Sequence, residues 1–163
     1  MPGLSNEYVE KLMYKLTINP HKFKGVKPCD IFLNEVKSKK QLLCKGCSFI
    51  INMSSSNNPG SHFVSIFILS DNEAEYFDSF GLPSFDSNIN NAFREANLSV
   101  LEFETSIQDI SSQFCGFYCI AYLIWRELGL EKTRFAQPFN TNSKIVNDTI
   151  VLELLKLYIK EKN

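Results

Sequence analysis

The chain has 163 residues, a length that predicts one domain spanning residues 1–163. Hydrophobic residues make up 44% of the chain and charged residues 21%, which excludes a disordered tail and a fibrous repeat. The 17 lysines and arginines nearly balance the 18 aspartates and glutamates, so the net charge of -1 argues against a nucleic-acid-binding protein.

The N-terminal part of the chain is predicted to contain two helices joined by a loop. Apolar residues recur at helical spacing over residues 5–16, which predicts an amphipathic helix with Ser5 as its N-cap. The segment 17–28 carries several lysines, two prolines and a glycine, so we expect an irregular basic loop there. Residues 30–36 are expected to form a short helix.

A strand-rich region follows. Residues 62–69 and 75–78 are rich in β-branched and aromatic side chains and are separated by the polar turn 70–73, which predicts a β-hairpin. The other elements expected here are strands at 48–53 and 99–104 and a helix that starts at Asp86 or Ser87 and ends near residue 96.

Two helices are predicted to close the chain. Residues 115–128 are almost all apolar up to Gly129, which is typical of a helix buried on most sides. Residues 143–160 form the last predicted helix. The order of helices, strands and helices predicts an α+β fold in which one helix is buried against a face of the sheet.

No stretch is apolar over the roughly 18 residues of a membrane span, and the N-terminus lacks the basic and apolar regions of a secretory signal. We therefore expect an intracellular protein without a membrane partner, whose five cysteines are reduced thiols. Cys44 and Cys47 form a CxxC pair without a second ligand pair or a following redox helix. We interpret both as ordinary thiols, and expect no metal or cofactor.

Cys115 lies in a position that favours chemistry. It joins the polar segment 106–113 to the predicted apolar helix, and the positive end of a helix dipole favours a thiolate. Gly116 has no side chain and leaves space for a substrate to approach. Taken alone, Cys115 is also typical of a buried core thiol, and Cys119, one turn further on, is expected to be core.

His62 and Asp78 are predicted to face each other across the hairpin. If the two strands pair antiparallel about residue 70, His62 lies directly opposite Asp78, with Cβ atoms about 5 Å apart. Such an aspartate fixes the imidazole tautomer and leaves the other ring nitrogen free to accept a thiol proton. The alternative is a strand-end aspartate that forms a turn before Gly81.

Gln108 precedes Cys115 in the polar segment. Its side-chain amide can donate a hydrogen bond to a developing oxyanion, alongside the backbone N–H of Cys115. From its spacing alone, Gln108 is an ordinary loop amide. Together with His62 and Asp78, however, these residues provide every group that a thiol protease needs.

Four pieces of the chain resemble the adenovirus-type cysteine proteases, which are the adenains and their relatives in Polinton or Maverick elements and adintoviruses. The pieces are Gly60-Ser61-His62-Phe63, Tyr76-Phe77-Asp78-Ser79-Phe80-Gly81-Leu82-Pro83, Gln108, and Gln113-Phe114-Cys115-Gly116-Phe117-Tyr118-Cys119. The SUMO-specific proteases share the same order of residues more distantly. The resemblance implies an α+β fold with a central mixed sheet and a buried helix that carries the nucleophile, the papain-like and SUMO-protease-like fold of adenain.

The resemblance also implies a role for each matching residue. Cys115 is the nucleophile, His62 the general base, Asp78 the residue that orients His62, and Gln108 part of the oxyanion hole. Substrate contacts are assigned to Gly60, Ser61, Phe63 and Gly116. The family cleaves virus capsid and core precursors, typically near glycines, so the expected partner is such a polypeptide and the expected location is the host nucleus or cytoplasm, or the virion.

Three features depart from the family. Phe63 stands where the family has tryptophan, which keeps the apolar packing but loses the indole donor. Asn97 stands where adenain has the cysteine that attaches an activating peptide, so any activating peptide is expected to bind without a disulfide. The net charge of -1 argues against the DNA cofactor that adenain uses.

The sequence therefore predicts a cysteine endopeptidase, and two alternatives remain. The first is an isopeptidase that removes ubiquitin-like or SUMO-like modifiers, whose Gly-Gly tails require the same chemistry. The second is an inactive, domesticated copy that binds a partner through its cleft, although the intact set of His62, Asp78, Gln108 and Cys115 argues against it.

Overall fold

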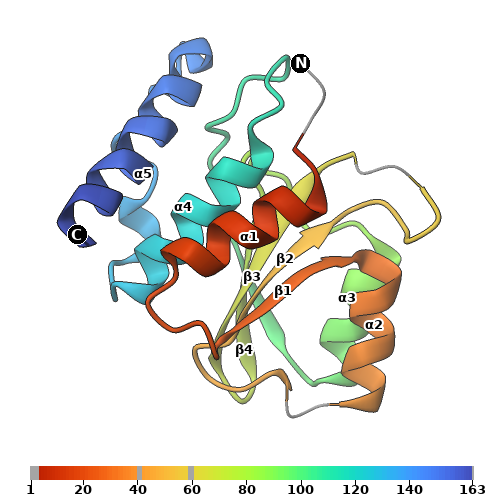
Figure 1. The fold of residues 1–163 in the computed structure, drawn as a ribbon. Helices are drawn as coiled ribbons and strands as arrows, with labels where there is room; N and C mark the ends of the chain where they lie inside the picture. The colour runs from red at the N-terminus through yellow and green to blue at the C-terminus, as the bar shows by residue number, and fades with distance from the viewer. Residues whose placement is uncertain (1–3, 40–41, 59–60, 163) are drawn as a thin grey trace.

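A computed structural model describes residues 4–39, 42–58 and 61–162, and its centre is a five-stranded mixed sheet (Figure 1). The strands lie side by side in chain order. They are β1 (Phe23–Pro28), β2 (Ser48–Asn52), β3 (Phe63–Ser70), β4 (Glu73–Phe77) and β5 (Ser99–Glu102). The inner pairs β2–β3 and β3–β4 are antiparallel, and the outer pairs β1–β2 and β4–β5 are parallel.

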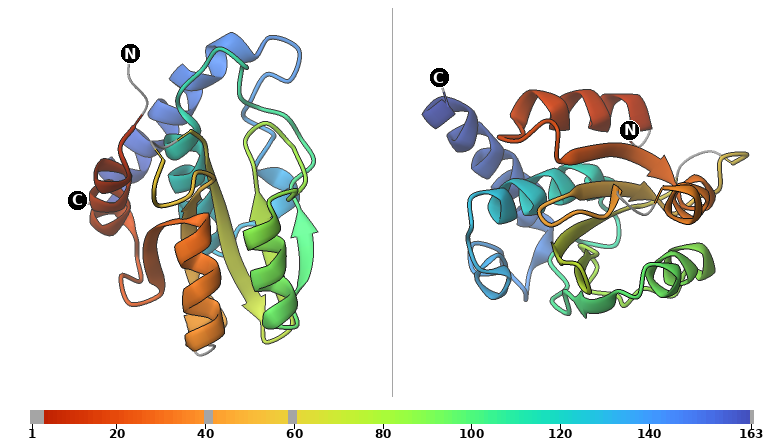
Figure 2. Two further views of the ribbon diagram at one scale, coloured as in Figure 1. Left: turned by 90° about the vertical axis from the view of Figure 1, so that its right-hand side faces the viewer. Right: turned by 90° about the horizontal axis from the view of Figure 1, so that it is seen from below.

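Helices cover both faces of this sheet, as the views in Figure 2 show. One face carries α4 (Cys115–Glu127), which packs on β3 and is flanked by α1 (Asn6–Leu16) and α5 (Asn147–Lys162). The other face carries α2 (Cys29–Ser38) and α3 (Ser87–Glu95). Strand alternation separates the two cores, because Ile50 belongs to the α4 side whereas Phe49 and Ile51 belong to the α2 side. The α+β fold predicted from the sequence is confirmed.

Helix α4 is buried over most of its surface, as its composition predicts. Nine of its residues, from Cys115 to Ile124, are buried. Short 3₁₀ turns, η2 (Lys132–Arg134) and η3 (Lys144–Val146), connect α4 to α5. None of the described helices is long and apolar enough to cross a membrane.

Strand β1 corrects the prediction of an irregular basic loop over residues 17–28. Phe23–Pro28 pairs in parallel with β2, with an irregularity between Phe23 and Val26 where Gly25 adopts a φ of 93°. The Glu10 side chain of α1 accepts a hydrogen bond from Val26 N at 3.0 Å. A glycine and a proline read as loop signals in sequence, but both are tolerated in an edge strand, where only one side of the backbone is paired.

The cysteines differ from prediction at the CxxC pair. Cys44 and Cys47 are joined in a disulfide, so the expectation that all five cysteines are reduced thiols is wrong for these two. Cys29, Cys115 and Cys119 are free and buried. The disulfide lies in the loop that leads into β2, where Gly46 N donates to Ile68 O at 2.8 Å. Residues three apart approach closely only in a turn, and the turn that brings Cys44 and Cys47 together was not among the predicted elements.

A tight turn follows β4 and directs Asp78. Gly81 N donates to Asp78 O at 2.9 Å, and Gly81 adopts a φ of 69°, in the left-handed region. A Cβ atom added at Gly81 would lie 2.6 Å from Ser106 N and 2.8 Å from Thr105 C, which are backbone atoms. The chain after β5 therefore crosses this turn at a distance that only glycine permits.

We predict that Gly81→Ala destabilises the fold by about 2–4 kcal/mol, because left-handed strain and a backbone clash act together. Gly129→Ala is the matched control, since Gly129 has a φ of 75° but nothing within 4 Å of its added Cβ. That control should cost about 1 kcal/mol. Denaturant unfolding of both variants measures the difference, and equal losses would contradict the close crossing.

Candidate active site

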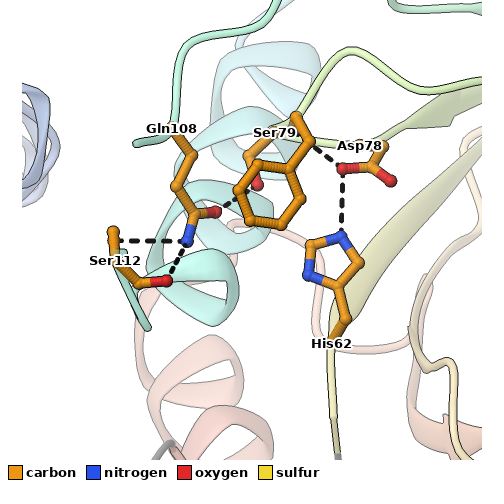
Figure 3. Close-up of polar contacts among 6 residues, drawn as sticks. His62, Asp78, Ser79, Gln108 and Ser112 are labelled. Carbon is orange, nitrogen blue, oxygen red and sulfur yellow. Dashed lines mark hydrogen bonds and ion pairs between the residues drawn. The ribbon is translucent and has the colours of Figure 1, made fainter. Parts of the chain in front are cut away.

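His62 and Asp78 meet at the ends of neighbouring strands. His62 directly precedes β3 and Asp78 directly follows β4. The His62 Nε2 and Asp78 Oδ1 atoms are 3.0 Å apart (Figure 3). The two predicted partners are therefore in hydrogen-bond contact.

The register that predicted this contact is wrong by two residues. Ser65 pairs with Phe77 and Ile66 pairs with Tyr76, so continuing the ladder places His62 opposite Phe80 rather than Asp78. The His62 and Phe80 rings stack with centroids 4.9 Å apart. Because side chains alternate with a period of two, a two-residue shift keeps Asp78 on the same face as His62, and the contact forms diagonally.

The Asp78 carboxylate is buried, with only 1% of the residue exposed. Its Oδ1 accepts hydrogen bonds from His62 Nε2 and from Phe80 N, the latter at 2.8 Å. A carboxylate accepts and does not donate, so Nε2 of His62 carries the hydrogen. The other ring nitrogen points away from Asp78 (Figure 3).

The electrostatics of the site favour a charged imidazole. Burial lowers the pKa of His62, but hydrogen bonds and charge interactions with Asp78 and Cys115 outweigh it and raise the pKa from 6.5 to about 9. Cys115 therefore lies close enough to His62 to interact electrostatically with its imidazole ring. Cys119, which is fully buried one turn along α4, has a pKa raised by desolvation and is a core thiol, as predicted.

Cys115 is the first residue of α4 and is 8% exposed. Phe114 stands at the N-cap position, and no side chain caps this helix start. The first N–H groups of a helix have no partner within the helix and carry the positive end of its dipole. The start of α4 is therefore suited to stabilise negative charge beside the Cys115 sulfur.

The Gln108 side chain is buried, and its amide is held at both ends. Its Oε1 accepts a hydrogen bond from Ser79 Oγ at 2.5 Å. Its Nε2 donates to Ser112 O at 2.9 Å and to Ser112 Oγ at 3.2 Å (Figure 3). The amide is thus fixed between Ser79 and Ser112, with its nitrogen turned toward Ser112.

These groups surround one cavity of about 740 Å³. Its wall contains His62, Gln108 and Cys115, whereas Asp78 lies behind the imidazole. The complete lining is Leu4, Ser5, Asn6, Glu7, Ser61, His62, Phe63, Phe80, Gln108, Ile110, Ser112, Gln113 and Cys115. The structure therefore brings the predicted nucleophile, base and amide donor together around a space large enough for a peptide segment.

The predicted substrate contacts lie in different places. Ser61 and Phe63 line the cavity, and Gly60 lies outside the described residues. Gly116 does not line it: a Cβ added there would lie 2.8 Å from Val9 Cγ2 and 3.0 Å from Leu4 Cδ1. The missing side chain at Gly116 therefore makes room for α1 rather than for open cavity.

Sequence analysis did not identify one wall of the cavity. Leu4 to Glu7, at the start of α1, lies beside the cavity although it is far from the other lining residues in sequence. Its only local signal is the Ser5 cap, whose Oγ accepts from Tyr8 N at 3.2 Å. No cluster of three or more histidine, cysteine or acidic side chains within the described ranges could hold a metal ion.

No family model and no curated protein matches this chain. Solved structures do. The crystal structure of the ASFV pS273R protease aligns with a TM-score of 0.58 at 19% identity, over 95% of this chain and 65% of that chain. Its selenomethionine form gives 0.54 at 18% identity, over 95% and 66%. AvrA delL154 with IP6 and CoA gives 0.50 at 17% identity, over 85% and 54%.

The chain shares the fold of these proteins. This likeness confirms the predicted SUMO-protease-like α+β architecture, with its mixed sheet and buried helix. At this level of identity the likeness extends to the fold alone. The chain spans less than two thirds of the length of the pS273R protease, 65% in the first alignment.

The raised pKa of His62 predicts a pH dependence. Because the folded pKa of about 9 exceeds 6.5, protonated His62 stabilises the fold fully below pH 6.5, and this contribution is lost as the pH rises through about 9. NMR titration of the ring protons should give a His62 midpoint near 9, with His21→Gln used to assign the signal. Asp78→Asn should lower the midpoint. A wild-type midpoint at or below 6.5 would mean that burial outweighs both partners.

Proposed function

We propose that this chain is a cysteine endopeptidase of the adenovirus type. The observation that carries the proposal is the position of His62, which is hydrogen-bonded to buried Asp78 and influenced by Cys115, in the wall of a peptide-sized cavity. The fold shared with a protein named as a protease, the ASFV pS273R protease, supports it. Neither observation alone specifies the reaction, but together they favour thiol-dependent cleavage of a peptide bond.

In the proposed reaction, the Cys115 thiolate attacks the scissile carbonyl carbon and a C–S bond forms. The carbonyl oxygen becomes an oxyanion. His62, protonated at neutral pH by virtue of its pKa of about 9, gives its proton to the leaving amine as the C–N bond breaks. Water, deprotonated by His62, then releases the acyl group from Cys115.

The oxyanion requires donors. The backbone N–H of Cys115 at the start of α4 is one, and the Gln108 amide is the other. In the structure Gln108 Nε2 donates to two atoms of Ser112, the backbone oxygen at 2.9 Å and Oγ at 3.2 Å. In the proposed reaction the oxyanion replaces Ser112 Oγ as the acceptor of the longer bond. The bond to Ser112 O holds the amide in place.

The proposed substrates are virus capsid or core precursors cleaved near glycines, as the resemblance to the adenovirus-type proteases implies. The proposed location is accordingly the infected host cell or the virion. An activating peptide, if the enzyme uses one, binds without a disulfide at position 97. Asn97 follows Ala96, the C-cap of α3.

Cys115→Ala should abolish cleavage, with a loss of at least about 10⁴-fold, because it removes the nucleophile. Thermal unfolding should stay near wild type, since only one sulfur is removed at the cavity wall. Cys119→Ala is the matched control on the same helix and should retain cleavage. The assay uses a glycine-containing capsid peptide beside SUMO-type and ubiquitin-type probes.

Each outcome decides between functions. Cleavage of the peptide that depends on Cys115 supports the proposal, and turnover of only the modifier probes would favour an isopeptidase. Labelled iodoacetamide near neutral pH should modify Cys115 selectively. Absence of both selective alkylation and cleavage in folded protein would favour an inactive binding domain.

Substitutions of Asp78 separate orientation from charge. Asp78→Ala removes both and should lower turnover by about 10⁴-fold, by analogy with serine triads. Asp78→Asn should lose less, about 10²-fold, because Phe80 N keeps an oxygen at the Oδ1 position and this oxygen still accepts from His62. Turnover measured at saturating peptide checks both values. Unchanged turnover in Asp78→Ala would show that Asp78 has only a structural role.

A further inference from the structure

The Gln108 amide is held by a chain of hydrogen bonds that reaches α5, on the far side of α4. Ser112 Oγ donates to Asp148 Oδ1 at 2.8 Å, and Tyr118 Oη donates to the same oxygen at 3.0 Å. Asp148 lies in the first turn of α5. We propose that Asp148 is a positioning residue, which acts through Ser112 to fix the orientation of the Gln108 amide; the catalytic part of this inference rests on the proposed function.

The Gln108 end of the chain shows why orientation needs to be fixed. A side-chain amide can rotate by half a turn and exchange its oxygen and nitrogen. The Ser79 hydroxyl does not prevent this exchange, because a hydroxyl can donate to Oε1 or accept from Nε2. Only partners on the Ser112 side can therefore determine which end of the amide faces which way.

Ser112 provides two such partners. Its backbone oxygen can only accept, so it requires Nε2, which lies 2.9 Å away. Its hydroxyl becomes a pure acceptor toward Gln108 only if its own hydrogen is engaged elsewhere. Asp148 engages that hydrogen, because an ionised carboxylate cannot donate one back. The freed lone pairs of Ser112 Oγ then accept from Gln108 Nε2 and from Phe114 N, both at 3.2 Å.

The surroundings of Asp148 maintain this polarity. An acidic side chain in the first turn of a helix interacts favourably with the helix dipole. Burial and the neighbouring Asp148 charge raise the pKa of Tyr118 well above its ordinary value, so Tyr118 remains a phenol that donates to Asp148. Two further charges lie near this group. The negative charge of Asp109 also raises the pKa of Tyr118, and the positive charge of Lys144 lowers the pKa of Asp109.

The same chain of hydrogen bonds also includes the residue that precedes the proposed nucleophile. Phe114, whose N–H donates to Ser112 Oγ, immediately precedes Cys115. One carboxylate on α5 thus orders the amide donor and the residue before the sulfur. A residue without an acceptor oxygen at position 148 would let the Ser112 hydroxyl rotate and donate toward Gln108, so that only Ser112 O, among the described partners on this side, would still oppose the reversed amide.

The test compares wild type with Asp148→Leu, which removes both acceptor oxygens and keeps a side chain of similar size. Glu153→Leu is the matched control, because Glu153 is an exposed acid on the same helix that pairs with Lys156. The first readout is solvent exchange of the Gln108 side-chain N–H groups, measured by NMR in protein labelled at its four glutamines. Gln108→Ala assigns the signal. Exchange should be at least about tenfold faster in Asp148→Leu and unchanged in the control.

The second readout separates oxyanion binding from thiol reactivity. Asp148→Leu should lower kcat for peptide cleavage by about tenfold or more, with KM unchanged, short of the roughly 10²–10³-fold loss expected when an oxyanion donor is removed. Alkylation of Cys115 by iodoacetamide forms no oxyanion and should be unchanged. Ser112→Ala combined with Asp148→Leu should be no worse than Asp148→Leu alone, since both act through one hydroxyl.

Each result decides the matter. Unchanged exchange in Asp148→Leu overturns the positioning role, whether or not the chain cleaves peptides. Faster exchange with an equal fall in cleavage and alkylation also overturns it, because a general loss of structure moves both. A wild-type chain that cleaves nothing removes the proposed function and the catalytic part of the inference, whereas faster exchange would still show that Asp148 holds the amide.

Discussion

The buried carboxylate of Asp78 is the constraint on which the site depends. A buried charge is costly unless hydrogen bonds replace its hydration. Two donors do so here, His62 Nε2 from the start of β3 and Phe80 N from the turn after β4. The second donor is available only because the chain reverses at Gly81, where backbone crosses too closely for any side chain.

The same turn presents Ser79, whose backbone oxygen accepts from Gln108 N and whose hydroxyl donates to Gln108 Oε1. Satisfying one carboxylate therefore positions the imidazole and the amide donor together.

Much of this could be predicted from sequence because it depends on local patterns. Helical spacing located α1, α2, α3 and α4 closely, and strand composition located β2 to β5. The contact between His62 and Asp78 was predicted correctly from a hairpin register that is off by two residues, because a period of two tolerates that error. Strand β1 was missed, since its Gly25 and Pro28 are loop signals unless a neighbouring strand is known to lie beside them.

What sequence could not predict are contacts between distant segments. The Ser79–Gln108–Ser112–Asp148 chain joins three regions whose separate residues are ordinary polar side chains. Gly116 was interpreted from the sequence as space for a substrate, yet that space is filled by Val9 and Leu4 of the N-terminal segment. Only the packing of α1 across the start of α4 reveals this use of the glycine.

The N-terminal wall of the cavity depends in turn on the C-terminal helix. The last carbonyls of α1 lack partners within the helix. Lys162 Nζ donates to two of them, Lys15 O and Leu16 O, and to the carbonyl of the C-cap Thr17, at 3.1–3.3 Å. Tyr158 Oη donates to Leu16 O at 2.9 Å. Helix α5 thus holds α1 at one end and, through Asp148, the Ser112 loop at the other. Residues at the start of α1 and Ser112 both line the cavity, so a helix that contributes no lining residue holds two of the segments that do.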